Sequence, residues 1–421
     1  MQSKSERNLP RLVLMSDFNP EEFVTIPDGW SCKRLADCTI DGNISYGIVQ
    51  PGKHVDDGVP VIRVNNVNNG QLELSGVLKV SPEIESKFKR TRLMGGEVLL
   101  TLVGSTGQSF VAPSKLRGWN VPRAIAVIRV NEAVGADWVN LCLQSKNTKH
   151  FLDVRANTTV QKTLNLKDVR DIPIIIPPKD TKEEIESTVF AFSKKIELLR
   201  EQNKTLETLA QAIFKEWFVH FNYPDATGEM VDSLSACNAQ AGELGEIPKG
   251  WRVGKLGEIA GIGSGKRPEN KSEQKTESHC IPLIGATKIM GYVENHLYHE
   301  DIIVIGRVGT HGEIQRFSEK VWASDNTLVI KSDNLDFVYF ILTGVDYEVM
   351  NRGAVQPLIT QTDLKNYPVI VPSDDVMMQF NQCIKPTFEK VKSNNSQIQT
   401  LSKTRDTLLP KLMSGQVRAY E

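Results

Sequence analysis

Residues that could perform covalent chemistry occur in this sequence only as fragments of motifs. Residues 18–21 (Phe-Asn-Pro-Glu) resemble a motif that activates an amino group, but Glu21 replaces its second proline. Residues 261–267 are glycine-rich and contain Lys266, but the spacing is wrong for a phosphate loop and no Ser or Thr follows the lysine. Glu85-Ser86-Lys87 matches the end of a metal-nuclease motif, yet the nearest upstream acid, Glu83, is too close to lie on a separate strand. The sequence therefore predicts a chain without catalytic residues.

Metal and disulfide chemistry is not indicated either. The six cysteines are scattered, without a Cys-x-x-Cys pair or histidines at zinc-ligand spacing. They are Cys32, Cys38, Cys142, Cys237, Cys280 and Cys383. We expect reduced, mostly structural thiols, no bound metal and no cofactor.

The composition is that of a soluble protein with two or three domains. Of the 421 residues, 40% are hydrophobic and 24% are charged. No window approaches the ~18 apolar residues of a membrane span, and residues 1–10 are polar and charged, so we expect a cytoplasmic protein. Lys and Arg number 50 against 51 Asp and Glu. Any surface that binds nucleic acid must therefore be local.

An internal repeat organises the chain. Residues 26–30 (Ile-Pro-Asp-Gly-Trp) match residues 247–251 (Ile-Pro-Lys-Gly-Trp) at an offset of 221. Further matches follow in the same order, and the offset falls to 195: residues 59–62 with 281–284, 103–107 with 308–312, 160–161 with 355–356, Asp168 with Asp363, and 173–177 with 368–372. Two copies of one domain with different interiors suit a protein that recognises two different targets.

Each copy changes from short strands to a long helix. Segments such as 96–103 and 124–130 have the composition of strands and are separated by Gly, Asn and Pro turns. Residues 180–221 and 373–416 contain few glycines and many helix-forming residues. The sequence therefore predicts an α+β fold in which two repeated β-rich domains are separated by two long helices.

The first predicted helix carries a regular heptad stripe about 50 Å long, which needs a partner helix. Its apolar positions and those of the second helix, 195 residues on, are Ile185, Val189, Phe192, Ile196, Leu199, Leu206, Ile213 and Trp217, with Phe380, Ile384, Val391, Ile398, Leu401, Leu408 and Leu412. We expect the two helices to form an antiparallel coiled coil with pseudo-two-fold symmetry. This pairing sets Asn203 opposite Asn394, where two buried amides could fix the register at a cost in stability.

The order of these elements resembles the specificity subunits of type I restriction–modification systems, over nearly the whole chain. The resemblance rests on the Pro-x-Gly-Trp openings, the Pro-flanked closing strands, the Gln161 and Gln356 segments, and the helix ends at 214–218 and 408–412. It implies that each β-rich domain is a target-recognition domain for one half of a split DNA site. The helices would set the spacing between the half-sites.

The resemblance also implies partners. Two methyltransferase (modification) subunits would dock on the helices and the recognition domains, S-adenosylmethionine would be bound by those subunits, and restriction subunits would join to form the nuclease. The domains expected are an N-terminal arm (1–25), recognition domain 1 (26–178), a central spacer helix (179–222), a linker (223–246), recognition domain 2 (247–372) and a C-terminal spacer helix (373–421). Exchange of residues 26–178 should then change one half-site only.

Base recognition needs loops that carry Arg, Lys, Asn, Gln, Ser or Thr. In the first copy the candidates are Arg63, Asn65, Asn66, Ser105, Thr106, Arg123, Gln161 and Lys162, with Lys87, Lys89, Arg90 and Arg92 for phosphates. In the second copy they are Lys288, Arg307, Thr310, His311, Asn326 and Gln356, with Lys266 and Arg267 for phosphates.

Structural explanations stay open for several candidates. The glycine-flanked turns could simply be tight turns, the two glutamines could cap backbone groups, and residues 87–92 could be an ordinary solvated surface. The main alternative function is a coiled-coil scaffold that binds only protein. The different polar loops on one repeated frame favour DNA recognition, because a scaffold does not need them.

Overall fold

The computed structural model describes residues 26–68, 71–72, 74, 76–104, 106–155, 163–224, 230–231, 247–307, 313–347 and 359–418. The chain divides into two compact units. The first unit comprises Met1–Glu197 and Ile398–Glu421, and the second unit comprises Leu198–Gln397. Among the described residues, no helix is both long and apolar enough to cross a membrane.

An antiparallel four-stranded sheet forms the centre of the first unit. Its strand order is β2 (Thr39–Tyr46), β9 (Ile125–Val130), β7 (Val98–Thr101) and β8 (Ser109–Val111). Alternate residues of β7 and β9 enter different cores: Leu100 lies in the core that includes helix α2 (Ala136–Gln144), whereas Leu99 lies in a second core. Both faces of this sheet are therefore covered.

The second unit repeats this topology with different strands. Its sheet has the order β14 (Gly261–Ser264), β20 (Thr327–Lys331), β17 (Ile302–Gly306) and β18 (Ile314–Phe317), again antiparallel. Helix α8 (Leu335–Thr343) contributes to the core on one face. The same order of four strands in both units is the structural form of the sequence repeat.

A two-stranded pair joins the first and last strands of each β-rich domain. Strand β1 (Ser31–Arg34) pairs with β10 (Pro173–Ile176), and β13 (Arg252–Lys255) pairs with β21 (Pro368–Val371). Each pair follows the Pro-x-Gly-Trp turn, in which the Trp30 amide donates to Pro27 O at 3.0 Å and the Trp251 amide donates to Pro248 O at 3.1 Å. The glycine of each turn has positive φ, which explains why glycine stands there twice.

Shorter elements complete the two units. The remaining strands are β3 (Val59–Val61), β4 (Val67–Asn68), β5 (Gln71–Leu72), β6 (Leu78–Val80), β11 (Tyr223–Pro224), β12 (Met230–Val231), β15 (Ile281–Ile284), β16 (Ile289–Val293) and β19 (Trp322–Ala323). The short helices are α1 (Pro82–Ser86), α3 (Lys146–Arg155), α4 (Leu166–Arg170), α7 (Leu256–Ile259) and α9 (Gln361–Lys365). Single 3₁₀ turns span Leu35–Cys38, Val64–Asn66, Lys89–Thr91 and Ser114–Leu116.

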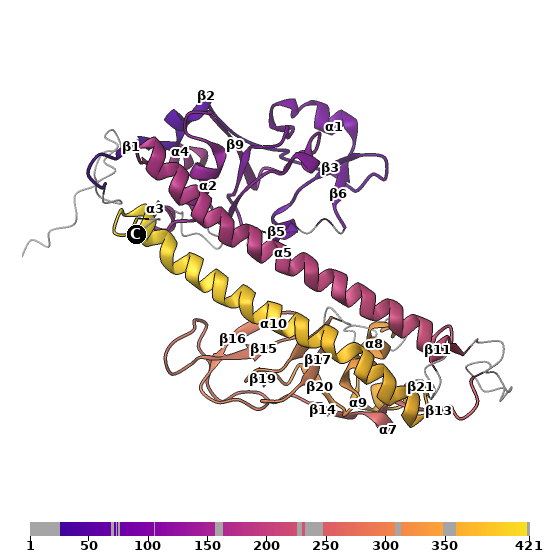
Figure 1. The fold of residues 1–421 in the computed structure, drawn as a ribbon. Coiled ribbons are helices and arrows are strands. Elements are labelled where there is room, and N and C mark those ends of the chain that lie inside the picture. Colours follow the sequence, from indigo (N-terminus) through magenta and orange to yellow (C-terminus); the bar gives the residue numbers. More distant parts are fainter. Residues whose placement is uncertain are drawn as a thin grey trace, which may run out of the picture. The chain divides into compact units, whose positions relative to one another are not determined.

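Two helices of 40 residues each follow the β-rich domains: α5 (Lys179–Phe218) and α10 (Asp374–Met413) (Figure 1). At 1.5 Å per residue, each is about 60 Å long. Helix α5 ends before the predicted residue 221, because Phe221 has φ of 60° and its ring packs against Trp251 at 5.6 Å. The boundary between the units falls inside both helices, so each unit contains a segment of each.

The helix segments pack antiparallel in each unit. In the first unit, Ile185 and Val189 of α5 share a core with Leu409 and Leu412, near the end of α10. In the second unit, the later part of α5 shares a core with the early part of α10: Ala210, Trp217, Phe380 and Ile384. All the predicted heptad positions are buried or half-buried. The fold is therefore α+β, with two repeated β-rich domains and a long antiparallel helix pair.

Two asparagines pair inside the helix packing of the second unit. Asn394 is fully buried, and its Nδ2 donates to Asn203 Oδ1 at 2.8 Å and to Gln202 Oε1 at 2.9 Å. Asn203 Nδ2 donates to Asn395 Oδ1 at 2.8 Å. Asn394 Oδ1 is buried without a hydrogen-bond partner among the described residues. The amide layer thus satisfies its donors but leaves one acceptor unpaired, which costs stability.

Replacing one asparagine of this pair should destabilise the helices, whereas replacing both should not. Asn203→Leu leaves a donor of Asn394 unpaired, and we expect a loss of about 1–3 kcal/mol in the free energy of unfolding. The double variant Asn203→Leu/Asn394→Leu removes both amides and should recover most of this loss. Thermal unfolding followed by circular dichroism at the helix band measures both. Strictly additive losses would contradict the coupling, and Thr208→Val, on the exposed face of α5, is the control.

Candidate nucleic-acid interface

Three loops of the first unit meet at one end of its four-stranded sheet. The Arg123 amide, before β9, donates to Ile48 O, after β2, at 2.8 Å. The Leu102 amide, after β7, donates to Ala124 O at 2.7 Å. We call this the loop end of the first sheet: the ends of β2 and β7 and the start of β9.

Several residues that the sequence predicted for DNA contact lie at this loop end. Arg123 is exposed there, and Thr106 is half-buried in the turn after β7. The segment with Arg63 and Asn65 joins them, because the Ile62 amide donates to Asn120 O at 3.0 Å. Ser105, Gln161 and Lys162 lie outside the described residues.

The second sheet has a corresponding loop end, made by the ends of β14 and β17 and the start of β20. The Arg307 amide donates to Asn326 O at 3.0 Å, and the Lys266 amide donates to Ala323 O at 2.9 Å. Lys266, Arg267 and Asn326 are exposed. Lys288, also exposed, follows β15, whose last residue accepts a hydrogen bond from the Ser324 amide at 3.0 Å. Thr310, His311 and Gln356 lie outside the described residues.

One arginine near each loop end keeps an unused donor. Arg63 Nε and Arg307 Nε are buried and have no hydrogen-bond partner among the described residues. Within the described part of the chain, the Arg63 side chain makes a long contact from Nη2 to Gly76 O at 3.4 Å. Both arginines are half-buried overall, so DNA contact through their outer guanidinium nitrogens stays a prediction, whereas the buried Nε donors cost stability.

Three other predicted DNA contacts have partners within the protein; burial makes the prediction for Asn66 wrong, and those for Arg90 and Arg92 stay predictions. Asn66 is only 4% exposed, and its Oδ1 accepts the Arg63 amide at 3.0 Å, so it caps a turn and does not face solvent. Arg92 forms a two-pronged pair with Glu85, with Nε to Oε1 at 2.7 Å. Arg90 donates to Asn43 Oδ1 from Nε at 3.1 Å. Of the basic run 87–92, only Lys87 and Lys89 remain as exposed cations without such a contact.

The Glu85–Arg92 pair is hydrogen-bonded to a buried polar network. Glu85 is 1% exposed, and Asn120 Nδ2 donates to Glu85 Oε1 at 3.2 Å. Thr91 Oγ1 in turn donates to Asn120 Oδ1 at 2.9 Å. The hydrogen bonds from Arg92 hold the pKa of the Glu85 carboxyl below its ordinary value of 4.5. The sequence could not reveal this role, because a buried partner for Arg92 is visible only in the tertiary fold.

The glycine-rich segment 261–267 begins inside the second sheet. Gly261–Ser264 forms strand β14 in the second sheet and is not a loop, so the glycines cannot wrap a phosphate. Only Gly265 and the residues after it leave the sheet. Within the described ranges, no group of three or more His, Cys, Asp or Glu could hold a metal ion.

A loop of the first unit was missed by the sequence prediction. Gly47 follows β2 as Gly265 follows β14, and a Cβ at Gly47 would lie 1.8 Å from Val121 O. A Cβ at Gly265 would lie 2.1 Å from Ser324 O. Both glycines therefore allow the same close backbone approach at the two loop ends. The signal in the sequence was the pattern Gly-x-x-x-Pro at 47–51 against Gly-x-x-Pro at 265–268, which differ in length by one residue.

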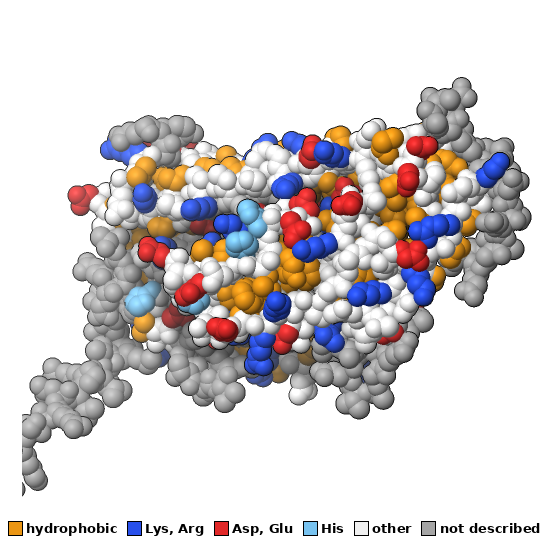
Figure 2. Space-filling model, turned by 90° about the horizontal axis from the view of Figure 1, so that it is seen from below, with side chains coloured by type: hydrophobic (Ala, Val, Ile, Leu, Met, Phe, Trp, Pro, Cys, Tyr) orange, Lys and Arg blue, Asp and Glu red, His pale blue; other side chains and the backbone are white. Residues whose placement is uncertain are grey.

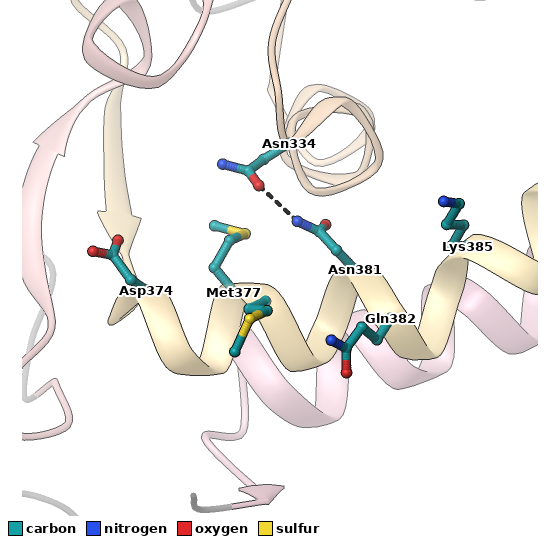
Figure 3. Close-up of a pocket in the computed structure, with 7 residues that line it drawn as sticks. Asn334, Asp374, Met377, Asn381, Gln382 and Lys385 are labelled. Atoms are coloured by element: carbon teal, nitrogen blue, oxygen red, sulfur yellow. Dashed lines mark hydrogen bonds between the residues drawn. The ribbon is translucent and has the colours of Figure 1, made fainter.

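A shallow hollow lies in the second unit, beside the first turns of α10 (Figure 3). Its volume is about 330 Å³, and Asn381 Nδ2 crosses it to donate to Asn334 Oδ1 at 2.6 Å. Asn334 is the residue before α8, so this bond connects α10 to the β-rich domain of the unit.

The face drawn in Figure 2 carries basic and acidic side chains interspersed, in keeping with the net charge of −1.

Comparison with known proteins identifies the repeated domain. The family model described as "Type I restriction modification DNA specificity domain" matches residues 38–208 and 248–402, which together cover most of the chain. The chain belongs to this family. Each match contains one four-stranded sheet with its loop end, so the specificity domain occurs twice in this chain.

The chain is also similar to specificity subunits of type I restriction enzymes. The chain is 25% identical over 441 residues to the type I restriction enzyme MjaIX specificity subunit of Methanocaldococcus jannaschii, covering 96% of this chain and 98% of the relative. It is 29% identical over 235 residues to the EcoBI specificity subunit of Escherichia coli, covering 53% of this chain and 48% of the relative. A crystal structure of the type I S subunit from M. genitalium aligns with a TM-score of 0.49 and 15% identity, over 92% of this chain and 98% of that one.

Removal of Arg92 should destabilise the first specificity domain in a pH-dependent way. Because the pKa of Glu85 is lowered in the folded state, the pair stabilises the fold above the ordinary pKa of 4.5, and this contribution is lost as the pH falls through the lowered value. Arg92→Ala should therefore lower the melting temperature at pH 7, and the difference from the unaltered chain should shrink in acid.

Lys87→Ala is the matched control, since Lys87 is exposed and lies in the same basic run. It should leave the melting temperature almost unchanged at both pH values. An equal effect of the two substitutions at pH 7 would show that Arg92 does not act through Glu85.

Proposed function

We propose that this chain is the DNA-recognition subunit of a type I restriction–modification complex. Each specificity domain recognises one half of a bipartite site, and the helix pair sets the spacing between the halves. The observation that carries this proposal is the double match to the DNA specificity domain, with one loop end in each sheet. The same observation favours DNA recognition over a protein-binding scaffold, which has no need of two such domains.

The charge and exposure of the loop ends support this function. Arg123 in the first unit and Lys266, Arg267 and Asn326 in the second are exposed side chains of the types that contact phosphates and bases. The net charge of the chain is −1, so a surface that binds DNA must be local, as these groups of polar and basic side chains are. The chain itself is non-catalytic in this proposal: methylation, with S-adenosylmethionine, belongs to the partner methyltransferase subunits.

The helices offer a surface for those partners. In the second unit, Leu198 and Leu209 are 56% and 52% exposed on α5, and their spacing of three turns places them on one face. Large apolar side chains exposed on one side of a helix are typical of protein contacts. We propose that this face of α5 contributes to the docking of a methyltransferase subunit.

Methylation sequencing of single DNA molecules tests the function directly. DNA from cells that express the chain with its neighbouring methyltransferase should carry a split motif of methylated adenines, absent with methyltransferase alone. Exchange of residues 26–178 for another recognition domain should alter one half of this motif and leave the other unchanged. Methylation that does not depend on the chain, or a change in both halves, would refute the proposal.

The docking surface is tested by charge substitution. Leu198→Glu/Leu209→Glu should abolish co-purification with the methyltransferase, because two carboxylates cannot be buried in an apolar contact. Lys204→Glu, which adds an acidic side chain to another exposed face of α5, is the control and should still co-purify. Retention of the complex by the double variant would exclude this face.

A further inference from the structure

The loop at residues 47–54 occupies the same place in the first sheet as residues 265–271 do in the second. Each begins with the glycine that packs against the backbone before the next central strand, Gly47 and Gly265. Each ends beside the antiparallel pair that contains the strand with a proline, β3–β6 in the first unit and β15–β16 in the second. The Val55 amide donates to Lys79 O at 3.0 Å in the first unit, and the Ser272 amide donates to Tyr292 O at 2.9 Å in the second.

The backbone of the first loop is held firmly. Ile48 is fully buried in a small core with Val61 and Val80. Gly52 has positive φ and would place a Cβ 3.3 Å from Ile84 Cδ1. The Lys79 amide donates to His54 Nδ1 at 3.2 Å. Residues on both sides of the loop tip are therefore fixed, which prepares the tip for binding without a large loss of conformational entropy.

The side chains at the loop tip, residues 49–53, indicate a role in recognition and not in stability. Val49 is 42% exposed, Gln50 and Lys53 are exposed, and Tyr46, just before the glycine, is 48% exposed. No hydrogen bond or ion pair of Gln50 or Lys53 is found within the described residues. The corresponding tip of the second unit is different in chemistry, with Lys266 and Arg267. Identical attachment with different tips is what two different half-sites require.

We propose that the loop 47–54 is a base-recognition element of the first specificity domain, an inference that rests on the proposed function. Gln50 binds an adenine edge through both atoms of its amide, as glutamine does in the major groove. Val49 contacts a neighbouring thymine methyl group, and Lys53 binds a phosphate. The loop lies beside Arg123, whose amide is bonded to Ile48 O, so loop and arginine contact the same half-site.

Methylation sequencing of the complex between the full chain and its methyltransferase tests this assignment. Gln50→Ala should relax the motif at one A·T position of the first half-site and leave the second half-site unchanged. In direct binding, the affinity for the cognate duplex should fall about tenfold or more, with little change for unrelated DNA. Lys266→Ala/Arg267→Ala serves as the reciprocal variant, which should leave the first half-site unchanged.

Lys53→Ala should weaken binding to all DNA sequences alike. The slope of the logarithm of the binding constant against the logarithm of the salt concentration should fall in magnitude by about one. Lys115→Ala is its matched control. Lys115 is exposed in the 3₁₀ turn Ser114–Leu116, and Trp119, after that turn, accepts a hydrogen bond from the Leu93 amide in the segment before β7. It should change neither affinity nor salt dependence.

The possible failures can be separated. If Gln50→Ala prevents assembly with the methyltransferase, Gln50→Glu is used, which keeps the length of the side chain and should shift the preferred base toward cytosine. A variant that assembles and methylates the unchanged motif overturns the role of the loop. Methylation that never depended on the unaltered chain overturns the proposed function instead.

Discussion

The burial of the apolar stripes of α5 and α10 is the constraint on which both units depend. The core of the first unit includes Leu412 and Met413, from the far end of the chain, beside the residues of its own β-rich domain. The core of the second unit includes Trp217 and Phe218, from the helix that follows the first domain. Each β-rich domain therefore completes its core with a helix from the other half of the sequence. Part of the apolar surface of each half of the chain is therefore buried only against the other half.

Polar contacts then fix how the helices and the sheet of the second unit fit. Arg316 on β18 pairs with Asp336 on α8 at 2.5 Å, and its guanidinium carbon lies 4.0 Å from the centre of the Phe388 ring on α10. Apolar packing alone allows small shifts of one element along another. A charge pair and a cation–π contact allow fewer such shifts, because both depend on distance and orientation. The amide layer of Asn203 and Asn394 acts similarly between the helices. These contacts connect the sheet of that unit to α8 and to α10.

Much of the fold could be predicted from the sequence, because repetition and heptad spacing are local patterns. The two long helices, the turns at Trp30 and Trp251, and the contact between Asn203 and Asn394 all follow from spacing. The candidate interface was harder, since residue type does not reveal a buried partner. Arg92 is of a residue type that contacts phosphates, and the structure adds a bond to the buried Glu85 that the sequence does not reveal. Conversely, the loop after Gly47 was missed because its match to residues 265–268 differs in length by one residue, and the meeting of three strand ends shows its place.

The two close backbone approaches at Gly47 and Gly265 have a consequence for how such a protein can evolve. Each loop is attached to its sheet by one glycine and a few backbone hydrogen bonds. The side chains at its tip contribute little to the core. A tract of a few codons could thus be exchanged between related genes without disturbing folding. New sequence preferences could then arise by short recombination events within a domain, and not only by inheritance of a whole domain.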